Sequence, residues 1–550
     1  MVFATGIDRA VTGPGRYNLS RQDVVLVVVI SLAALLLRLL QIGDASLWTD
    51  EGYSLWFSRQ PLGALWGDIA RNEYNPTLYY ILLNGWMSIF GESAAAMRSL
   101  SATLNAATIP LVYLTARWSV RSSDASLVAT LSSVLFALAF AELQYAQEAR
   151  TYTLCVLAMS IVLAASVRIT GGVSDLATGA ASSIPRWPFV MLAVGGALAL
   201  WGHYSSLIFL AIIGAFHLFL LWRTADHRQL LSIRYALAGA MFLALGGRAL
   251  WLMLAYALPA SDNFWIAVPS LSDVIDATSI IFGGALAMDS WSLEVLTRIL
   301  LFAPWPLLGA YALWQRGKET ERLCLALFIL SSIVAFSAYL AVTYLGKPVF
   351  LQRVVLSAQL GWVVMCGACI LAFRDRQFRA IAASLLVAAF SASALSYVMN
   401  KQVTNPKEPW KEIAARIAKE SAIGETVFVT ATSGILISHY LVAEGRTDLN
   451  VTSINGAYRT PPARSLFASS GIRYTTPISP ELAEDFAGAL AQTDTSWIIL
   501  RNPDGPNWEL VRPVIKNTNA EYTLYQPGPL GVYRIAPGAG EGTSLARGSE

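Results

Sequence analysis

Long hydrophobic runs separated by short polar segments fill the first 400 positions of the chain. A helix needs about 20 mostly apolar residues to cross the hydrocarbon core of a bilayer. The pattern predicts about eleven such helices, at 24–42, 96–116, 125–143, 151–168, 188–202, 205–222, 235–257, 292–314, 323–345, 354–373 and 380–399. A mean hydropathy of +0.51 over the chain agrees with this pattern. We therefore predict an α-helical polytopic membrane protein.

Residues 76–91 form an apolar and aromatic stretch that is shorter than the predicted spans. If this stretch crossed the bilayer, every later loop would change sides and the arginine-rich loops would face outward. We therefore expect residues 76–91 to lie along the outer surface or to dip into it. A true crossing is the alternative.

Basic residues in alternate loops predict the orientation of the spans. Positively charged loops stay in the cytoplasm. On that side we place five loops and the N-terminal segment, with Arg9, Arg16, Arg21, Arg117, Arg121, Arg168, Arg186, Arg223, Arg228, Arg234, Arg316, Lys318, Arg322, Arg374, Arg376 and Arg379. Residues 43–95 and everything after 400 then lie outside the cytoplasm. The net charge of +3 is too small to indicate a nucleic-acid partner.

The composition changes after position 400, where the long apolar runs end. A capped helical pattern at 410–420 is followed by strand-like runs at 426–430, 497–500 and 531–535. Alternating helices and strands predict a small α/β domain. We assign residues 1–400 to a transmembrane catalytic domain with an outer loop at 43–95. Residues 401–536 form the extracytoplasmic α/β domain, and the Gly-rich tail 537–550 is predicted to be disordered.

Two adjacent carboxylates, Asp50 and Glu51, follow directly after the first predicted span. Only 14% of the residues are charged and 55% are hydrophobic, so a pair of acids beside the bilayer is conspicuous. We predict Asp50 as a catalytic base, with a helix N-cap as the alternative. For Glu51, a role in the site as metal ligand or orienting group and simple solvation at the interface both stay open.

Other polar residues gather at the outer ends of the predicted spans. Acids come from one loop and bases from three others. As substrate-binding candidates we take Arg38, Glu73, Asn75, Tyr79, Arg150, Tyr152, His203, Tyr204, Lys347 and Arg353. Arginine suits bidentate contact with phosphate, and lysine acts as a point charge. Sugar transfer to a hydroxyl needs a base, and the leaving phosphate needs positive charge.

Several of these residues can also be explained without a substrate. Arg38 can extend its charged end to the membrane surface without touching a substrate. His203 and Tyr204 can belong to an interfacial aromatic belt, and Glu73 can be a solvated loop residue. No metal-ligand cluster of known spacing occurs in the sequence, and a divalent cation held by Glu51 or Glu73 stays open.

Four short motifs, taken in their order and spacing, resemble the GT-C superfamily of membrane glycosyltransferases. The match is to the bacterial branch near protein O-mannosyltransferases and the lipid A aminoarabinose transferase. It covers about residues 24–400 and, more loosely, the C-terminal domain. The motifs are Leu47-Trp48-Thr49-Asp50-Glu51, Asn75-Pro76-Thr77-Leu78-Tyr79-Tyr80, Glu148-Ala149-Arg150-Thr151-Tyr152 and Phe350-Leu351-Gln352-Arg353.

The resemblance implies an extracytoplasmic active site, a polyprenyl-phosphate-sugar donor and, usually, inversion at the anomeric carbon. It also implies that Asp50 acts as the base or organises the site. The chain departs from the pattern at two places. Relatives often have His-Pro-Pro where this chain has Asn75-Pro76-Thr77, which puts a histidine-dependent metal or proton role there in doubt. Relatives often have Arg-Tyr where this chain has Arg353-Val354, so the stacking partner of the arginine is missing.

We therefore predict an inner-membrane glycosyltransferase, of the hexosyl or pentosyl type, with a periplasmic active site. Its partners would be a polyprenyl-phosphate-linked sugar donor, the bilayer and a glycan, lipid or protein acceptor. The sequence identifies neither the sugar nor the acceptor. A lipid or solute transporter, or flippase, is one alternative, and a catalytically inactive subunit with a GT-C-like fold is the other.

Overall fold

The computed structural model divides the chain into two compact units. The first unit combines Met1–Ile42 with Leu65–Asn405, and the second combines Gly43–Ala64 with Pro406–Glu550. The structure thus groups the segment that carries Asp50 with the C-terminal residues. The residues described are 19–73, 75–224, 228–260, 266, 268–284, 291–315, 317–346, 348–401, 406–429, 431–454, 480–505, 508–518, 520–526 and 530–535. The predicted disordered tail, 537–550, lies outside them.

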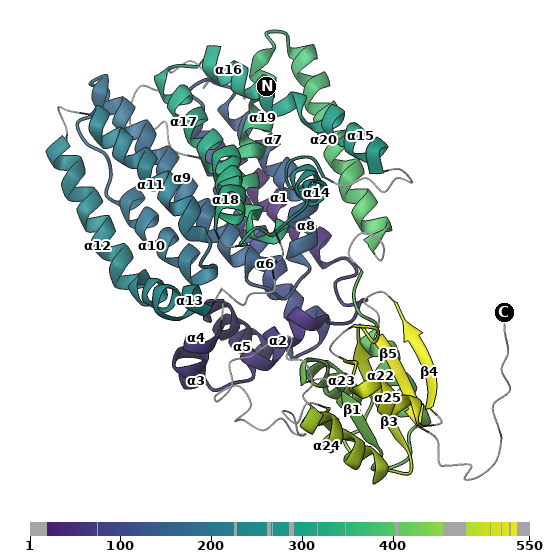
Figure 1. The fold of residues 1–550 in the computed structure, drawn as a ribbon. Helices are drawn as coiled ribbons and strands as arrows, with labels where there is room; N and C mark the ends of the chain where they lie inside the picture. Colours follow the sequence, from purple (N-terminus) through teal and green to yellow (C-terminus); the bar gives the residue numbers. More distant parts are fainter. Residues whose placement is uncertain are drawn as a thin grey trace. The chain divides into compact units, whose positions relative to one another are not determined.

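The first unit is helical (Figure 1). Its elements are α1 (Arg21–Leu39), α4 (Asp68–Asn72), α5 (Leu78–Phe90), α6 (Ala94–Ser119), α7 (Ala125–Leu138), α8 (Phe140–Ala146), α9 (Tyr152–Ala177), α10 (Trp187–Gly202), α11 (Ser206–Arg223), α12 (Arg228–Leu252), η3 (Met253–Ala257), α13 (Leu258–Ala260), α14 (Leu271–Phe282), α15 (Trp291–Phe302), α16 (Pro304–Gln315), α17 (Glu319–Ile329), η5 (Leu330–Val334), α18 (Ala335–Leu345), η6 (Gln352–Val354), η7 (Leu356–Ala358), α19 (Gln359–Gly367), η8 (Ala368–Ala372) and α20 (Arg376–Met399). The short helix α3 (Leu62–Trp66) lies at the boundary between the two units.

Seven helices among the described residues are long and apolar enough to cross a membrane, and the bent pair α7 and α8 makes an eighth candidate. Each predicted span coincides with one or more helices of the first unit. The helical membrane fold is therefore confirmed, whereas the predicted number of about eleven spans stays a prediction. Helix α14, which lies between the predicted spans 235–257 and 292–314, was not expected from the sequence.

The helix α5 corresponds to the short stretch 76–91. It has 13 residues, which gives a length of about 20 Å against the ~30 Å of a hydrocarbon core. One face, with Tyr79, Tyr80, Leu83 and Met87, is buried, while Phe90 at its end is exposed. This length and this one-sided burial favour a position at the membrane surface.

The arginine-rich loops meet at one end of the first unit. Arg121 pairs with Asp175 at 2.8 Å, and Arg223 pairs with Glu319 at 2.7 Å. The backbone amide of Arg121 also donates to Glu321 Oε1 at 2.7 Å. These bonds join the ends of α6, α9, α11 and α17. Because α9 runs from Tyr152 to Ala177, the turn that carries Arg150 lies at the opposite end of the unit.

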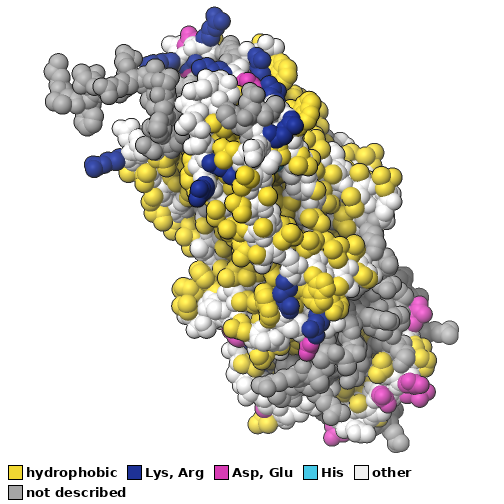
Figure 2. All heavy atoms as spheres, turned by 90° about the vertical axis from the view of Figure 1, so that its left-hand side faces the viewer, with side chains coloured by type: hydrophobic (Ala, Val, Ile, Leu, Met, Phe, Trp, Pro, Cys, Tyr) yellow, Lys and Arg dark blue, Asp and Glu magenta, His cyan; other side chains and the backbone are white. Residues whose placement is uncertain are grey.

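A broad hydrophobic surface covers the sides of the first unit. Figure 2 shows hydrophobic side chains over most of the upper and middle part of one face, with most of the Lys and Arg side chains toward its upper end. Large apolar side chains of α11 and α12 are exposed, among them Leu218, Trp222, Leu237 and Leu243. An apolar surface of this extent on helices of spanning length identifies an integral membrane protein.

The second unit contains a five-stranded mixed sheet in the order β2-β1-β3-β5-β4. Strands β1 and β2 are parallel, as are β1 and β3, whereas β5 runs antiparallel to β3 and β4. The elements are α2 (Thr49–Ser58), α22 (Trp410–Glu420), β1 (Thr426–Val429), α23 (Ala431–Ala443), β2 (Asn450–Ser453), α24 (Pro480–Ala491), β3 (Ser496–Arg501), α25 (Val511–Lys516), β4 (Ala520–Tyr525) and β5 (Leu530–Ile535). The predicted α/β domain is confirmed, and strands β2 and β4 are additions to the prediction.

The two faces of the sheet differ in how they are covered. On one face, Phe428 and Ile498 pack with Phe486 of α24 and Val511 of α25 in a single apolar cluster. Side chains alternate along a strand, so Trp497 faces the other side, toward α22. Helices therefore cover both faces, and the unit has its own hydrophobic core.

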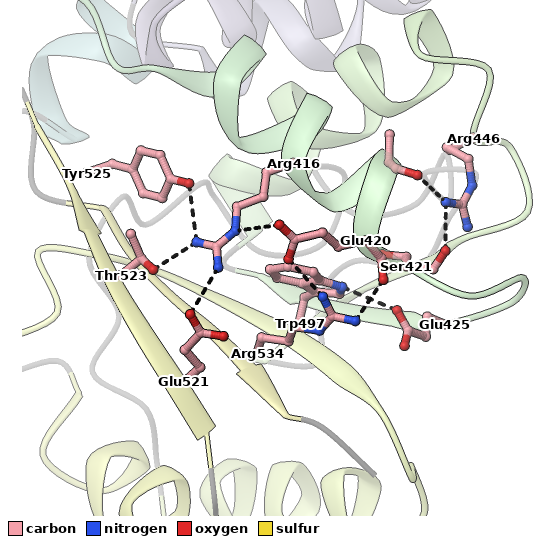
Figure 3. Close-up of polar contacts among 11 residues, drawn as sticks. Arg416, Glu420, Ser421, Glu425, Arg446, Trp497, Glu521, Thr523, Tyr525 and Arg534 are labelled. Carbon is pink, nitrogen blue, oxygen red and sulfur yellow. Dashed lines mark hydrogen bonds and ion pairs between the residues drawn. The ribbon is translucent and has the colours of Figure 1, made fainter.

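A charged network fastens α22 over Trp497 (Figure 3). The Cζ atoms of Arg416 and Arg534 lie 5.6 and 5.0 Å from the centroid of the Trp497 ring. Glu420 accepts hydrogen bonds from Arg534 at 2.8 Å and from Arg416 at 3.3 Å. Trp497 is fully buried and donates from Nε1 to Glu425 at 3.3 Å. This network has a structural role in the sheet-and-helix packing.

Candidate active site

Two arginines approach one tyrosine ring at the end of the first unit that lies opposite the arginine-rich loops. The Cζ atoms of Arg150 and Arg353 are 6.0 and 5.7 Å from the centroid of the Tyr152 ring. Both distances are within the range of a cation–π contact. The sequence indicated that Arg353 had lost its stacking partner, because Val354 follows it. In the structure Tyr152 takes that position from a segment about 200 residues earlier.

The backbone around Arg150 is fixed by neighbouring helices. Ser101 of α6 donates its hydroxyl to the Arg150 carbonyl at 3.2 Å, and the Tyr79 hydroxyl lies 2.8 Å from Ser101 Oγ. Thr151 donates to the carbonyl of Gly202 at 2.5 Å. Arg150 is 7% exposed, so its charge sits in a low-dielectric setting where electrostatic interactions are strong. Tyr79 supports this turn through Ser101.

Arg353 lies on η6, in a segment that hydrogen bonds hold at both ends. Tyr145 of α8 donates to Gln352 Oε1 at 3.1 Å. The amide of Phe350 donates to the Thr343 hydroxyl at 2.9 Å. These contacts tie the Arg353 segment to α8 and α18. The guanidinium of Arg353, like that of Arg150, lies near the Tyr152 ring.

Glu73 is a buried acid whose carboxyl interacts electrostatically with Arg150. It is 4% exposed and accepts hydrogen bonds at Oε1 from Asn75 at 3.0 Å and from Tyr80 at 3.2 Å. Burial raises the pKa of the Glu73 carboxyl, although those hydrogen bonds and the charge of Arg150 act in the opposite direction. The interpretation of Glu73 as a solvated loop residue is therefore wrong.

His203 and Tyr204 complete the cluster from the turn between α10 and α11. The His203 ring centroid is 6.1 Å from that of Tyr152, and His203 Nδ1 lies 2.6 Å from Ser205 Oγ. Burial and the charges of Arg150 and Arg353 lower the pKa of His203 to about 4. Burial, together with the charge of Glu73, raises the pKa of Tyr204. Both residues are thus neutral near pH 7 and close to charged members of the site.

The lowered pKa of His203 predicts a pH-dependent stability. A histidine in an unfolded chain has a pKa near 6.5. Between pH 6.5 and 4 this side chain is therefore protonated in the unfolded chain and neutral in the folded one. The contribution of His203 to the free energy of unfolding is fully present above pH 6.5 and falls as the pH drops, by about 1–2 kcal/mol at pH 5. We expect His203→Gln to remove this loss in thermal unfolding of the purified protein at pH 7.5 and 5.0. An unchanged pH dependence in His203→Gln would contradict the assignment.

Arg38 is fully buried and its guanidinium is engaged within the first unit. It donates from Nε to Asn105 Oδ1 at 2.6 Å and from Nη1 to the carbonyls of Ala34 and Ala137 at 3.1 and 3.0 Å. Extension of Arg38 to the membrane surface, one of its two interpretations, is therefore wrong. These bonds give Arg38 a structural role, and we leave it out of the proposed phosphate site.

Asp50 and Glu51 lie on α2, in the second unit. Trp48 occupies the N-cap position, so Asp50 falls in the first turn of the helix. Glu51 is fully buried and its Oε2 accepts the backbone amide of Trp48 at 3.2 Å. The interpretation of Glu51 as an interfacially solvated acid is wrong, whereas Asp50 is partly exposed.

One predicted site residue is not among the described residues, and three residues near the site were not predicted. Lys347 falls outside the described residues. Within the described ranges, no three His, Cys, Asp or Glu side chains gather closely enough to hold a metal ion. Tyr80, Tyr145 and Gln352 were missed, although Gln352 directly precedes Arg353 and Tyr80 follows Tyr79. For Tyr80 and Gln352 this adjacency was the available signal, whereas Tyr145 adjoins no predicted site residue.

Comparisons with solved structures show the same fold in membrane glycosyltransferases. ArnT from Cupriavidus metallidurans matches at 11% identity with a TM-score of 0.52, over 92% of this chain and 97% of ArnT. The same values hold for ArnT bound to undecaprenyl phosphate. The Archaeoglobus fulgidus oligosaccharyltransferase in complex with Zn and sulfate matches at 14% identity with a TM-score of 0.52, over 93% of this chain and 73% of that one.

No family model and no curated protein sequence matches the chain. At 11–14% identity the structural likeness shows the fold alone. ArnT and the archaeal oligosaccharyltransferase are both members of the GT-C superfamily. The resemblance drawn from the sequence motifs is thus confirmed for the architecture: the chain has a GT-C-type helical membrane fold with a C-terminal α/β unit.

Proposed function

We propose that the protein is a membrane glycosyltransferase that takes a sugar from a polyprenyl-phosphate donor. The observation that carries this proposal is the pair Arg150 and Arg353, whose Cζ atoms lie 6.0 and 5.7 Å from the centroid of the Tyr152 ring at one end of a GT-C-type helical unit. Bidentate guanidinium groups are well suited to a phosphate. The fold shared with ArnT, which binds undecaprenyl phosphate, supports the lipid-linked donor.

The ionisation of the cluster favours an anionic ligand. Arg150 and Arg353 are cationic, His203 is neutral because its pKa is lowered to about 4, and burial raises the pKa of Glu73. A phosphate that binds near the arginines would shift Glu73 further toward its protonated form, because like charges disfavour ionisation. Glu148, 3% exposed in the same turn, offsets part of the positive charge. The remaining positive charge would stabilise the phosphate as it leaves the sugar.

We assign the role of base to Asp50. In a single displacement, Asp50 takes the proton of the acceptor hydroxyl while the hydroxyl oxygen attacks the anomeric carbon. The bond from that carbon to the phosphate oxygen breaks, and the polyprenyl phosphate leaves with its electron pair. The product has the inverted configuration. The partly exposed place of Asp50 in the first turn of α2 supports this role, and Glu51 supports the turn through the Trp48 amide.

We also propose the side of the membrane. The arginine-rich loops meet at one end of the first unit, and the positive-inside rule assigns that end to the cytoplasm. The Arg150 end would then lie on the periplasmic side of the inner membrane. The residues after 400 would lie on that side too, because they follow an odd number of predicted spans. No step is assigned to a metal, because the described residues bring no set of ligands together. Transport, the rival function, would favour ionisable groups near mid-membrane.

A direct test compares the lipid-linked sugars and envelope glycans of cells with and without the gene by mass spectrometry. We expect one polyprenyl-phosphate sugar to accumulate in the deletion strain, and one glycan, lipid or protein to lose that sugar. Complementation with the wild-type gene should restore both. Unchanged glycans together with altered distribution of a lipid across the membrane would favour a transporter.

A further inference from the structure

The helix that carries Asp50 is packed closely against α23 of the second unit. A Cβ atom added at Gly52 would lie 2.9 Å from Leu436 Cγ, closer than side-chain carbons approach in proteins. Leu436 is fully buried and has little room to move. Glycine at position 52 therefore permits this approach, and α2 is held by packing as well as by hydrogen bonds.

The carboxylate of Glu408 accepts hydrogen bonds from four donors, two of which belong to Thr49 in the first turn of α2. Thr49 donates its amide at 3.1 Å and its hydroxyl at 2.8 Å, both to Oε2. Trp410 donates from Nε1 to Oε2 at 2.9 Å, and Arg501 donates from Nε to Oε1 at 2.8 Å. Glu408 is 6% exposed. A buried anion at a helix N-terminus is stabilised by the amides that point at it.

The residues before α2 are held by the same part of the chain. The Leu47 amide donates to the Tyr440 hydroxyl at 2.6 Å. Lys411 donates from its amide to Ser46 Oγ at 3.0 Å and from Nζ to the carbonyl of Gly43 at 2.6 Å. The segment from residue 43 to the first turn of α2 therefore takes its course from groups in α22 and α23.

We propose that Glu408 is a positioning residue for Asp50, and that the C-terminal α/β unit takes part in the reaction by orienting α2. Thr49, which Glu408 binds twice, directly precedes Asp50. A base must be held near its working geometry, and a displacement of about 1 Å can cost ~100-fold in rate. The role of Asp50 itself rests on the proposed function, whereas the dependence of α2 on Glu408 does not.

The decisive variant is Glu408→Gln, which keeps the shape of the side chain but replaces one acceptor oxygen by a donor amide. We expect faster amide hydrogen exchange in residues 46–58 and unchanged exchange in β1 and β3. We also expect kcat for sugar transfer to fall by about tenfold or more, with the KM for the lipid donor unchanged within about twofold.

The matched control is Glu420→Gln, because Glu420 is also an ion-paired acid of the second unit, and its partners Arg416 and Arg534 lie on α22 and β5 (Figure 3). The Glu420→Gln substitution should lower the melting temperature. It should leave both kcat and the amide hydrogen exchange of residues 46–58 at wild-type values. A drop in kcat of equal size in Glu408→Gln and Glu420→Gln would reduce Glu408 to a purely structural residue and overturn the proposal.

A second pair of variants tests the same idea through packing. Gly52→Ala should push α2 away from Leu436 and lower kcat by about tenfold, although alanine is the better helix former by about 1 kcal/mol. The double variant Gly52→Ala with Leu436→Ala should recover most of the lost activity, because the shorter side chain makes room for the added methyl group. Should Glu408→Gln fail to fold, this rescue decides the question, and its absence would overturn the proposal.

The two proposals fail in different ways. If Asp50→Asn abolishes transfer while Glu408→Gln and Gly52→Ala retain full kcat, the positioning role is wrong and the proposed function stands. If the wild-type protein transfers no sugar, the proposed function is wrong, and the hydrogen exchange of residues 46–58 still tests whether Glu408 orders α2. Unchanged exchange in Glu408→Gln would overturn that ordering in either case.

Discussion

Replacing Asp50 by asparagine is expected to lower the rate of sugar transfer by about 10²- to 10⁴-fold, the range that a positioned general base contributes. Asparagine has nearly the same shape as aspartate and caps helices equally well. Trp48, not Asp50, occupies the N-cap position of α2. The fold and the donor affinity should therefore survive the change. Transfer from the polyprenyl-phosphate donor, measured in membranes at equal protein level, gives the result.

The matched control is Asp44→Asn, in the same segment before α2. Asp44 is exposed, and its backbone carbonyl accepts a hydrogen bond from Lys411 Nζ at 3.2 Å. The substitution keeps that carbonyl, so transfer should stay at the wild-type rate. Wild-type transfer in Asp50→Asn would remove Asp50 from the chemistry and leave it a helix residue of the first turn.

Replacing Arg150 by methionine is expected to cost about 2–4 kcal/mol of transition-state stabilisation, by comparison with lost oxyanion donors. This corresponds to a fall in kcat/KM of roughly 30- to 1,000-fold. Methionine keeps much of the buried volume. Glu73 does not become an uncompensated buried charge, because burial raises its pKa and it can take up a proton. The protein should therefore fold, and Arg353→Met should show a loss of similar size.

The control for both variants is Arg223→Met, at the opposite end of the first unit. Arg223 pairs with Glu319 at 2.7 Å across side chains that are about half exposed, and exposed pairs contribute only about 0–1 kcal/mol. Its transfer activity should be normal. The double variant of Arg150 and Arg353 should lose less than the two single losses together, because the arginines share one ligand. Equal losses in Arg150→Met and Arg223→Met would point to a general effect on folding.

The sequence predicted the helical part well, because a span has a composition that can be recognised locally. About 20 consecutive apolar residues carry the signal, and each predicted span falls on helix. The position of the charged loops was equally readable. Arg121, Arg223 and their acidic partners meet at one end of the first unit, as alternate basic loops predicted.

Contacts between segments that are far apart in the chain could not be predicted from the sequence. The sequence gives no indication that Glu408 binds Thr49, which lies 359 positions earlier. The replacement of a tyrosine after Arg353 by Tyr152 is equally hidden, because residues about 200 positions apart meet only through the packing of helices. The alternative that Arg38 extends to the membrane surface was wrong, because its partner Asn105 lies in another apolar helix.

The central claim, that Arg150 and Arg353 hold a lipid phosphate, is tested most directly by ligand binding to the purified protein. Native mass spectrometry can compare undecaprenyl phosphate with undecaprenol, which has the same chain and no phosphate. The account predicts that the wild-type protein prefers the phosphate by about tenfold or more, and that the double variant Arg150→Met with Arg353→Met loses this preference. Equal binding of the two lipids by the wild-type protein, or an undiminished preference in the double variant, would contradict it.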